Sequence, residues 1–242
     1  MLRLTVLLAL VSFFIDLSST ARLRNGGCSS GGSCGMTPPV AAVLKDKVTG
    51  IEFPCEATFP GTPKMTLLGA GPRRKNLGIA KVNVYSVGLY VEPKEAAKAL
   101  SSFKGESEES LMNDDRFYDT LLGKEVPKLV LLKFARTVGA HKVADALSAV
   151  KGVEPEVVSE FCSLLEKGMG ASIKKAETIA MGWTEDQRLD VLIRGQPAGT
   201  VVDAKLPKAF FELYLGKTPV SMEAKHAFVK RVASLFSKEK AE

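Results

Sequence analysis

Residues 69–91 read GAGPRRKNLGIAKVNVYSVGLYV. The glycines and the proline at the start of this stretch favour a turn. The Val, Tyr and Leu enrichment from Ile79 onward predicts a long strand. Three consecutive cations, Arg73, Arg74 and Lys75, lie between them. Either these charges cover a solvated bend, or one of them points inward toward a negatively charged ligand.

The composition is typical of a globular protein with a hydrophobic core. The chain has 242 residues, of which 45% are hydrophobic and 25% charged, enough for one large domain or two small ones. Its net charge of +6 is spread along the chain, which favours anionic partners without identifying one. Neither a zinc-finger array nor an aromatic-studded RNA-binding strand is found in the sequence, so we expect no nucleic-acid partner.

Residues 1–21 are predicted to be a secretory signal peptide. Arg3 supplies a positive start, and the apolar run at 4–15 is shorter than the ~20 residues that a membrane span needs. Ser19 and Ala21 are the small residues expected before a cleavage site. The alternatives are an uncleaved anchor or a buried helix. With cleavage, the mature protein is expected to have no stable membrane span.

Residues 22–40 are predicted to be a flexible linker, because they are rich in Gly and Ser. They are basic at the front and carry no acid, which also suits a plastid transit segment behind a signal peptide. Secretion and plastid targeting therefore both remain open, and a fluorescent fusion of the first 40 residues would distinguish them. Cys28 and Cys34 in this segment could pair in an oxidising compartment.

Residues 41–242 are expected to form a single α+β domain. Strands come first and in between, and helices gather in the second half, which favours an antiparallel sheet with helices on one face. The strands are expected at 48–54, 65–68, 79–91 and 128–136, with a hairpin at 189–194 and 199–203. The helices are expected at 95–103, 107–122, 138–150, from Pro155, at 206–215 and from Ser221, the last with a core stripe of Phe228, Val232, Leu235 and Phe236.

The usual signatures of metal or nucleophile chemistry are missing from the sequence. His141 and His226 lie far apart in the chain, and no cysteine has a nearby partner that would activate it. Cys162 is expected on the apolar side of a helix. The Gly-rich stretch lacks the Gly-Lys-Ser/Thr sequel of a phosphate loop. We therefore expect no metal and no cofactor.

Five features together resemble the chalcone isomerase family. They are GAGPR at 69–73, Tyr85 twelve residues after Arg73, SVGLYV at 86–91, GQPAGTVVDAKL at 195–206 and LPKAFFELYLGKTPVSMEAKHAFVKRVA at 206–233. The last two resemble most closely the non-catalytic, fatty-acid-binding branch of that family. The resemblance covers about residues 47–236 and implies an open-faced β-sandwich, with a large antiparallel sheet, a helical layer and a ligand cleft between them.

The resemblance also implies that Arg73 points into the cleft and meets the anionic or carbonyl end of a ligand. In flavonoid-forming isomerases a threonine occupies the place of Tyr85, and a later substrate-contacting threonine the place of Leu213. A tyrosine and an asparagine of those enzymes correspond roughly to Lys142 and Ala149. The arginine is thus kept, whereas most of its polar companions are replaced.

These residues favour non-enzymatic binding of a fatty acid or a similar apolar carboxylate. A guanidinium matches a carboxylate with two parallel hydrogen bonds, and Tyr85 would add a third donor. Leu213 would belong to the cleft wall, and each methylene buried there contributes about 0.8 kcal/mol. The alternative is a chalcone–flavanone isomerase, an intramolecular lyase acting on a phenolic enone, in which Arg73 would be catalytic. A non-catalytic helper that binds polyketide-derived phenolics is a third hypothesis. The sequence leaves the acyl length and the oligomeric state open.

Overall fold

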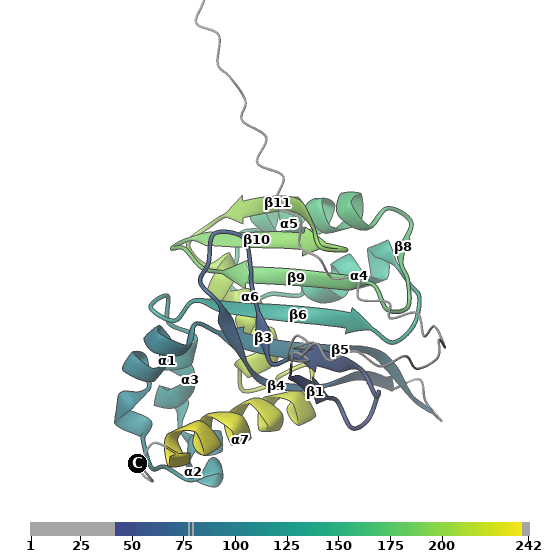
Figure 1. Cartoon of the computed structure of the whole chain (residues 1–242). Helices are drawn as coiled ribbons and strands as arrows, with labels where there is room; N and C mark the ends of the chain where they lie inside the picture. Colours follow the sequence, from purple (N-terminus) through teal and green to yellow (C-terminus); the bar gives the residue numbers. More distant parts are fainter. Residues whose placement is uncertain (1–41, 77, 79, 239–242) are drawn as a thin grey trace, which may run out of the picture. The chain divides into compact units, whose positions relative to one another are not determined.

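The computed structural model describes residues 42–76, 78 and 80–238, with side chains as far as residue 233 (Figure 1). The predicted signal peptide at 1–21 and the linker at 22–40, with Cys28 and Cys34, lie outside the described residues. So do the side chains of Leu235 and Phe236. Residues 40–242 form one compact unit. Within the described part of the chain, no helix combines the length and the apolar character that crossing a membrane requires.

The main sheet has seven strands, in the order β11-β10-β9-β6-β5-β4-β3, and every neighbouring pair is antiparallel. Its strands are β3 (Glu56–Ala57), β4 (Met65–Asn76), β5 (Lys81–Val91), β6 (Lys128–Phe134), β9 (Thr178–Trp183), β10 (Arg188–Ile193) and β11 (Gln196–Val202). Two small pairs accompany it in the described residues, β1 (Val43–Lys45) with β2 (Glu52–Pro54) and β7 (Val138–Gly139) with β8 (Ser172–Ile173).

The helices lie mainly on one face of this sheet. They are α1 (Pro93–Ala99), η1 (Ser101–Phe103), α2 (Glu108–Asn113), α3 (Asp115–Leu121), α4 (Ala140–Leu147), α5 (Pro155–Met169), α6 (Leu206–Leu215) and α7 (Met222–Lys238). Figure 1 shows α4, α5 and α6 behind the sheet and β1 in front of it. One face thus carries a helical layer and the other a small hairpin, so the predicted α+β open-faced sandwich is confirmed.

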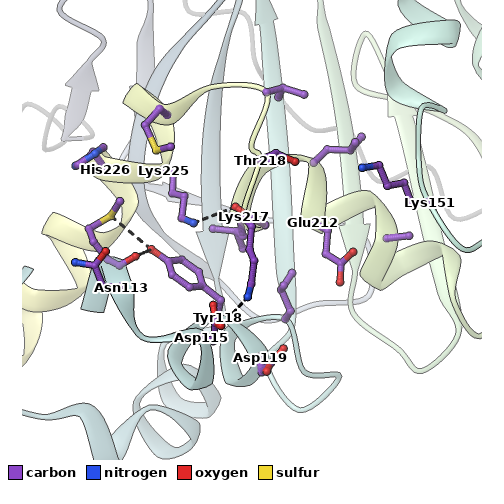
Figure 2. Close-up of a pocket in the computed structure, with 18 of the residues that line it drawn as sticks. Asn113, Asp115, Tyr118, Asp119, Lys151, Glu212, Lys217, Thr218, Lys225 and His226 are labelled. Atoms are coloured by element: carbon purple, nitrogen blue, oxygen red, sulfur yellow. Dashed lines mark hydrogen bonds and ion pairs between the residues drawn. The ribbon is translucent and has the colours of Figure 1, made fainter. Parts of the chain in front are cut away.

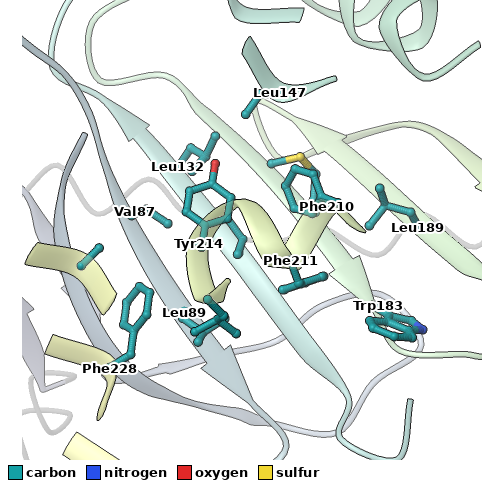
Figure 3. Packing of buried hydrophobic residues seen from close by; sticks show 14 of the residues in the cluster. Val87, Leu89, Leu132, Leu147, Trp183, Leu189, Phe210, Phe211, Tyr214 and Phe228 are labelled. Atoms are coloured by element: carbon teal, nitrogen blue, oxygen red, sulfur yellow. The ribbon is translucent and has the colours of Figure 1, made fainter. Parts of the chain in front are cut away.

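The main core lies between the sheet and α6. Phe210, Phe211 and Tyr214 of α6 are at most 1% exposed, and Figure 3 shows them against Val87 of β5 and Leu132 of β6. The rings of Phe210 and Phe211 meet edge-on with centroids 5.4 Å apart, a favoured aromatic geometry. Burial of each such side chain contributes about 1.5–3 kcal/mol. This packing fixes α6 over the middle of the sheet.

A buried carboxylate fastens the β1–β2 hairpin to the opposite face. Asp46 in the turn is 3% exposed and Ser86 of β5 is completely buried. The Ser86 hydroxyl donates to Asp46 Oδ2 at 2.5 Å, and the Thr49 hydroxyl donates to the same oxygen at 2.6 Å. Since a buried charge is costly unless it is hydrogen-bonded, this cluster ties the hairpin to one place on β5.

The expected glycine turn is wrong. Gly69 and Gly71 lie inside β4, which continues to Asn76, and Asn76 pairs with Lys81 of the antiparallel β5. These glycines are required by a neighbouring helix. A Cβ atom at Gly71 would lie 2.6 Å from Ala224 Cα of α7, and one at Gly69 would lie 2.7 Å from the Ala227 carbonyl oxygen. Pro72 is tolerated because β3 pairs with β4 only at residues 65 and 66, so β4 is an edge strand there.

Three further expectations are corrected. The helix predicted at 107–122 is two helices, because Asp114 is extended and its carboxylate accepts a hydrogen bond from the Arg116 backbone N–H. Strand β9, in the middle of the sheet, was not predicted. The strand expected at 48–54 is shortened to β2, and a turn precedes it.

Other elements agree with the prediction. Helix α6 spans 206–215, and α5 begins at Pro155. Ser221 caps α7 by accepting from the Ala224 N–H at 3.1 Å, and its hydroxyl donates to the Pro72 carbonyl at 2.6 Å. The predicted hairpin is present, but its turn is the two-residue Arg194-Gly195, with φ of 55° and 76°. Positive φ at both positions is the requirement of a tight hairpin turn.

Gly71→Ala is expected to destabilise the fold, because its methyl group would overlap the backbone of α7. Overpacking of this kind costs about 1–3 kcal/mol in the free energy of unfolding. The measurement is urea denaturation followed by circular dichroism. Gly139→Ala is the control, since a Cβ there meets nothing within 4 Å, and its effect should stay below about 1 kcal/mol. An equal effect of the two substitutions would contradict the close packing of α7 on β4.

Lys128 is completely buried at the start of β6. Its Nζ donates to the Gly123 carbonyl at 2.7 Å and lies 4.0 Å from the centroid of the Trp183 ring. Burial lowers the pKa of Lys128 from 10.5 to about 7. Between these two values the unfolded chain binds a proton that the folded protein lacks, so stability rises with pH in that window, by at most ~1.4 kcal/mol per unit.

We therefore expect the free energy of unfolding to increase between pH 7 and 9, and Lys128→Met to flatten this increase. Thermal and urea denaturation at several pH values would measure it. Lys142→Met removes an exposed lysine and should keep the wild-type slope. Parallel stability curves for Lys128→Met and the wild type would show that Lys128 does not cause the pH dependence.

Candidate ligand-binding site

Arg73 and Tyr85 are direct partners across the β4–β5 hairpin. Opposite residues of an antiparallel pair project to the same face with Cβ atoms about 5 Å apart. The next pairs along the hairpin, Gly71 with Val87 and Gly69 with Leu89, belong to that same face, which α7 covers. The twelve-residue spacing seen in the sequence is therefore the length of a hairpin that brings a guanidinium beside a phenol.

Tyr214 of α6 joins this pair, and sequence reasoning missed it. Its hydroxyl lies 3.2 Å from the Tyr85 hydroxyl, and the two side chains are 1% and 6% exposed. Burial raises the pKa of both phenols. For Tyr85 the hydrogen bond with Tyr214 and the charge of Arg73 offset part of that rise. The sequence did contain a signal for the inward position of Tyr214: it lies four residues after Phe210, and residues at this spacing share one side of a helix. In α6 that side faces the sheet.

Arg73 is half-buried, and its Nη1 donates to the Arg74 carbonyl at 2.8 Å. Among the described residues, Arg73 forms no ion pair. The Arg74 side chain is 29% exposed and pairs with Glu223 of α7 at 3.0 Å. Lys75 is exposed. Of the three consecutive cations, Arg73 is therefore the one that is half-buried and has no ion-pair partner among the described residues.

Arg73 and Leu213 line an open cleft of about 1370 Å³. Its walls come from β4, from α2 and α3, from the end of α4, from α6 and from α7 (Figure 2). The apolar part of the lining includes Met112, Leu122, Ala149, Leu213 and Val220, and the charged part includes Glu109, Asp119, Lys151, Glu212 and Lys217. Tyr85 is not part of this lining; it is buried in contact with Tyr214.

The cleft is more polar than the apolar gap that the sequence suggested. Ala149 lines it, whereas Lys142 is exposed outside it. His226 lines the cleft with a half-exposed ring, and His141 lies on the surface, 2.7 Å from Glu166. The part of the chain that the structure describes contains no cluster of three or more side chains suited to a metal ion. Cys162 is half-buried against the core, as its place on the apolar side of a helix predicted.

A family model described as chalcone isomerase-like matches residues 45–229. This chain belongs to the chalcone isomerase-like family. The predicted resemblance is thereby confirmed, and it extends over the whole main sheet and over the helices as far as the first half of α7.

The proteins similar to this chain include both chalcone–flavanone isomerases and fatty-acid-binding proteins. A chalcone–flavanone isomerase of Phaseolus vulgaris is 24% identical over 210 residues, which cover 79% of this chain and 93% of the relative. Fatty-acid-binding protein 1 of Arabidopsis thaliana is 24% identical over 199 residues, covering 77% and 69%. The crystal structure of a fatty-acid binding protein of Arabidopsis thaliana superimposes with a TM-score of 0.68 at 22% identity, covering 81% of this chain and 100% of that one. That likeness establishes the fold.

The Tyr85–Tyr214 contact predicts a coupled pair of substitutions. Tyr85→Phe would leave the buried Tyr214 hydroxyl without its partner, at a cost of about 1–3 kcal/mol. Adding Tyr214→Phe removes the orphaned hydroxyl, so the double variant should be more stable than the sum of the single effects predicts, by about 0.5–3 kcal/mol. Denaturation of the four proteins measures this coupling.

Tyr90→Phe provides the matched control. Tyr90 lies on the opposite face of β5, where its hydroxyl donates to the Pro54 carbonyl at 3.0 Å. The loss of stability caused by Tyr90→Phe should simply add to the loss caused by Tyr85→Phe, because the two hydroxyls share no hydrogen-bond partner. Additive effects for the Tyr85 and Tyr214 pair as well would show that their hydroxyls are not in contact in solution.

Proposed function

We propose that this member of the family binds a fatty acid or a similar apolar carboxylate without transforming it. The carboxylate is held by the Arg73 guanidinium in the cleft wall, and the Tyr85 hydroxyl, buried beside Arg73 behind the lining, would be its second donor. The observation that carries the proposal is the position of Arg73: it lines the cleft, has no ion-pair partner among the described residues, and sits opposite a buried tyrosine pair. A half-buried guanidinium in that position favours an anion, and its planar fork matches a carboxylate.

The number of O–H donors in the Tyr85–Tyr214 pair also supports a carboxylate as the ligand. Each hydroxyl has one hydrogen to donate, and the single contact between Tyr85 and Tyr214 uses one of the two. When Tyr214 donates to Tyr85, the O–H of Tyr85 is free to donate elsewhere. An ionised carboxylate only accepts hydrogen bonds, so it complements the guanidinium and this free O–H. Tyr214 is then a positioning residue that orients Tyr85.

The apolar part of the lining would hold the acyl chain. Leu213, Val220 and Leu122 line the cleft, and each methylene buried against such surfaces contributes about 0.8 kcal/mol. The carboxylates Glu109, Asp119 and Glu212 are exposed at the rim. Their repulsion of a bound anion is screened by salt beyond about 8 Å. Affinity would therefore come from the chain and orientation from the head group.

The isomerase relative supports a second candidate, a chalcone–flavanone type of ring closure. Arg73 could stabilise the negative charge that develops on the ketone. The reaction also requires the phenolate and the enone to be held in a reactive pose. Leu213 and Ala149, which line the cleft at places where the resemblance implies polar residues in the isomerases, offer an apolar side chain and a methyl group. We therefore favour binding over catalysis.

The test is to purify the full chain and identify co-purifying lipids by mass spectrometry. We expect bound fatty acid in the wild type. In titrations with a defined fatty acid, Arg73→Met should weaken binding at least tenfold, because a charge-assisted hydrogen bond contributes about 1.5–3 kcal/mol. Arg74→Met is the matched control, since that neighbour pairs with Glu223 and should change the affinity less than twofold.

Two results would overturn the proposal. One is the absence of fatty-acid binding by the folded wild-type protein. The other is turnover of a chalcone well above its spontaneous cyclisation rate and lost in Arg73→Met, which would instead favour the isomerase.

A further inference from the structure

Lys225 of α7 is a buried cation in the wall of the cleft. The side chain is 6% exposed, whereas Lys151 and Lys217 in the same wall are exposed. Its Nζ donates to the Gly216 carbonyl at 3.0 Å and lies 3.8 Å from the centroid of the Tyr118 ring (Figure 2). An ammonium has three N–H donors. The carbonyl takes one and the ring face a second, which leaves one for the cleft that Lys225 lines.

The acids around Lys225 do not neutralise it by direct contact. Asp115 is the carboxylate whose charge acts on it, and Asp115 is engaged by Lys217 at 2.7 Å. Glu108 lies 4.0 Å from His226. Among the described residues Lys225 forms no ion pair, and burial lowers its pKa. A cation without a paired anion in a water-poor position gains more from an added anion than an exposed lysine does.

The packing of α7 on β4 brings Lys225 to the same cleft as Arg73. Gly71 contacts Ala224, and Lys225 is the next residue of the helix. Arg73 follows Gly71 by two positions on the same face of the strand. Both cations line the cleft, whose volume of about 1370 Å³ exceeds the ~300–1,000 Å³ of most small-molecule sites. There is room for a ligand that reaches both.

We propose that the cleft takes an apolar ligand that carries two acidic groups, one bound at Arg73 and the other at Lys225. This inference rests on the proposed binding of a carboxylate at Arg73. Lys225 is the second anion contact, with Tyr118 and Gly216 holding its ammonium in place. The separation of the two cations selects the distance between the acidic groups, so the site discriminates among ligands by length.

The test compares straight-chain α,ω-dicarboxylic acids of increasing length with monocarboxylic acids of the same length, by calorimetric titration of the full chain. We expect one length or a narrow range at which the diacid binds at least tenfold more tightly than the monoacid. Lys225→Met keeps an unbranched apolar stem and should abolish that gain while leaving monoacid affinity within about threefold. Lys151→Met removes an exposed cation of the same cleft and should preserve the gain.

Lys225→Arg is the rescue variant, since it keeps the charge, and it should retain part of the gain. Circular dichroism and a thermal melt establish that each variant is folded. Diacids that bind no more tightly than monoacids at every length, or a gain that survives Lys225→Met, would overturn this inference while monoacid binding still supported the proposed function. Failure of both acids to bind the wild type would reject the two together.

Discussion

The geometry of the candidate ligand-binding site depends on the contact between the backbones of β4 and α7. At Gly69 and Gly71 the strand presents no side chain, so the helix lies directly on it. Ser221 strengthens this contact from the helix side by capping α7 and donating to the Pro72 carbonyl. The strand continues straight from this contact into Arg73. A displacement of α7 would therefore change both the position of the guanidinium and the wall of the cleft facing it.

The sequence predicted the elements that have strong local signals. Helix α6 has Pro207 in its first turn and Gly216 at its end, and hydrophobic residues at helical spacing between them. The antiparallel sheet and the helical layer followed from the order of the elements. The glycine-rich start of β4 was misjudged because local propensity favours a turn there, and only a helix 150 residues later explains those glycines. Strand β9 contains Ala180 and Gly182, two residue types depleted in strands, so its local strand signal is weak.

The candidate site was predictable only where a local sequence pattern marks its residues. Arg73, Tyr85 and Leu213 could be named from their similarity to a family motif. Tyr214 and Lys225 could not, because their positions beside Tyr85 and in the cleft wall arise from contacts between α6, α7 and the sheet that no short pattern encodes. The charged rim of the cleft has the same origin: it gathers acidic side chains from α2, α3 and α6 and two lysines from the segments that follow α4 and α6. Tertiary packing, and not local chemistry, brings these groups together.

The tyrosine pair has a property that neither hydroxyl has alone. Either oxygen can be the donor, so rotation of two O–H bonds reverses the polarity of the contact without displacing a heavy atom. In one orientation Tyr85 offers a hydrogen outward, and in the other it offers a lone pair. Under the proposed function, the pair could present a hydrogen to an ionised acid or a lone pair to its protonated form by reorienting two protons, with the heavy atoms in place.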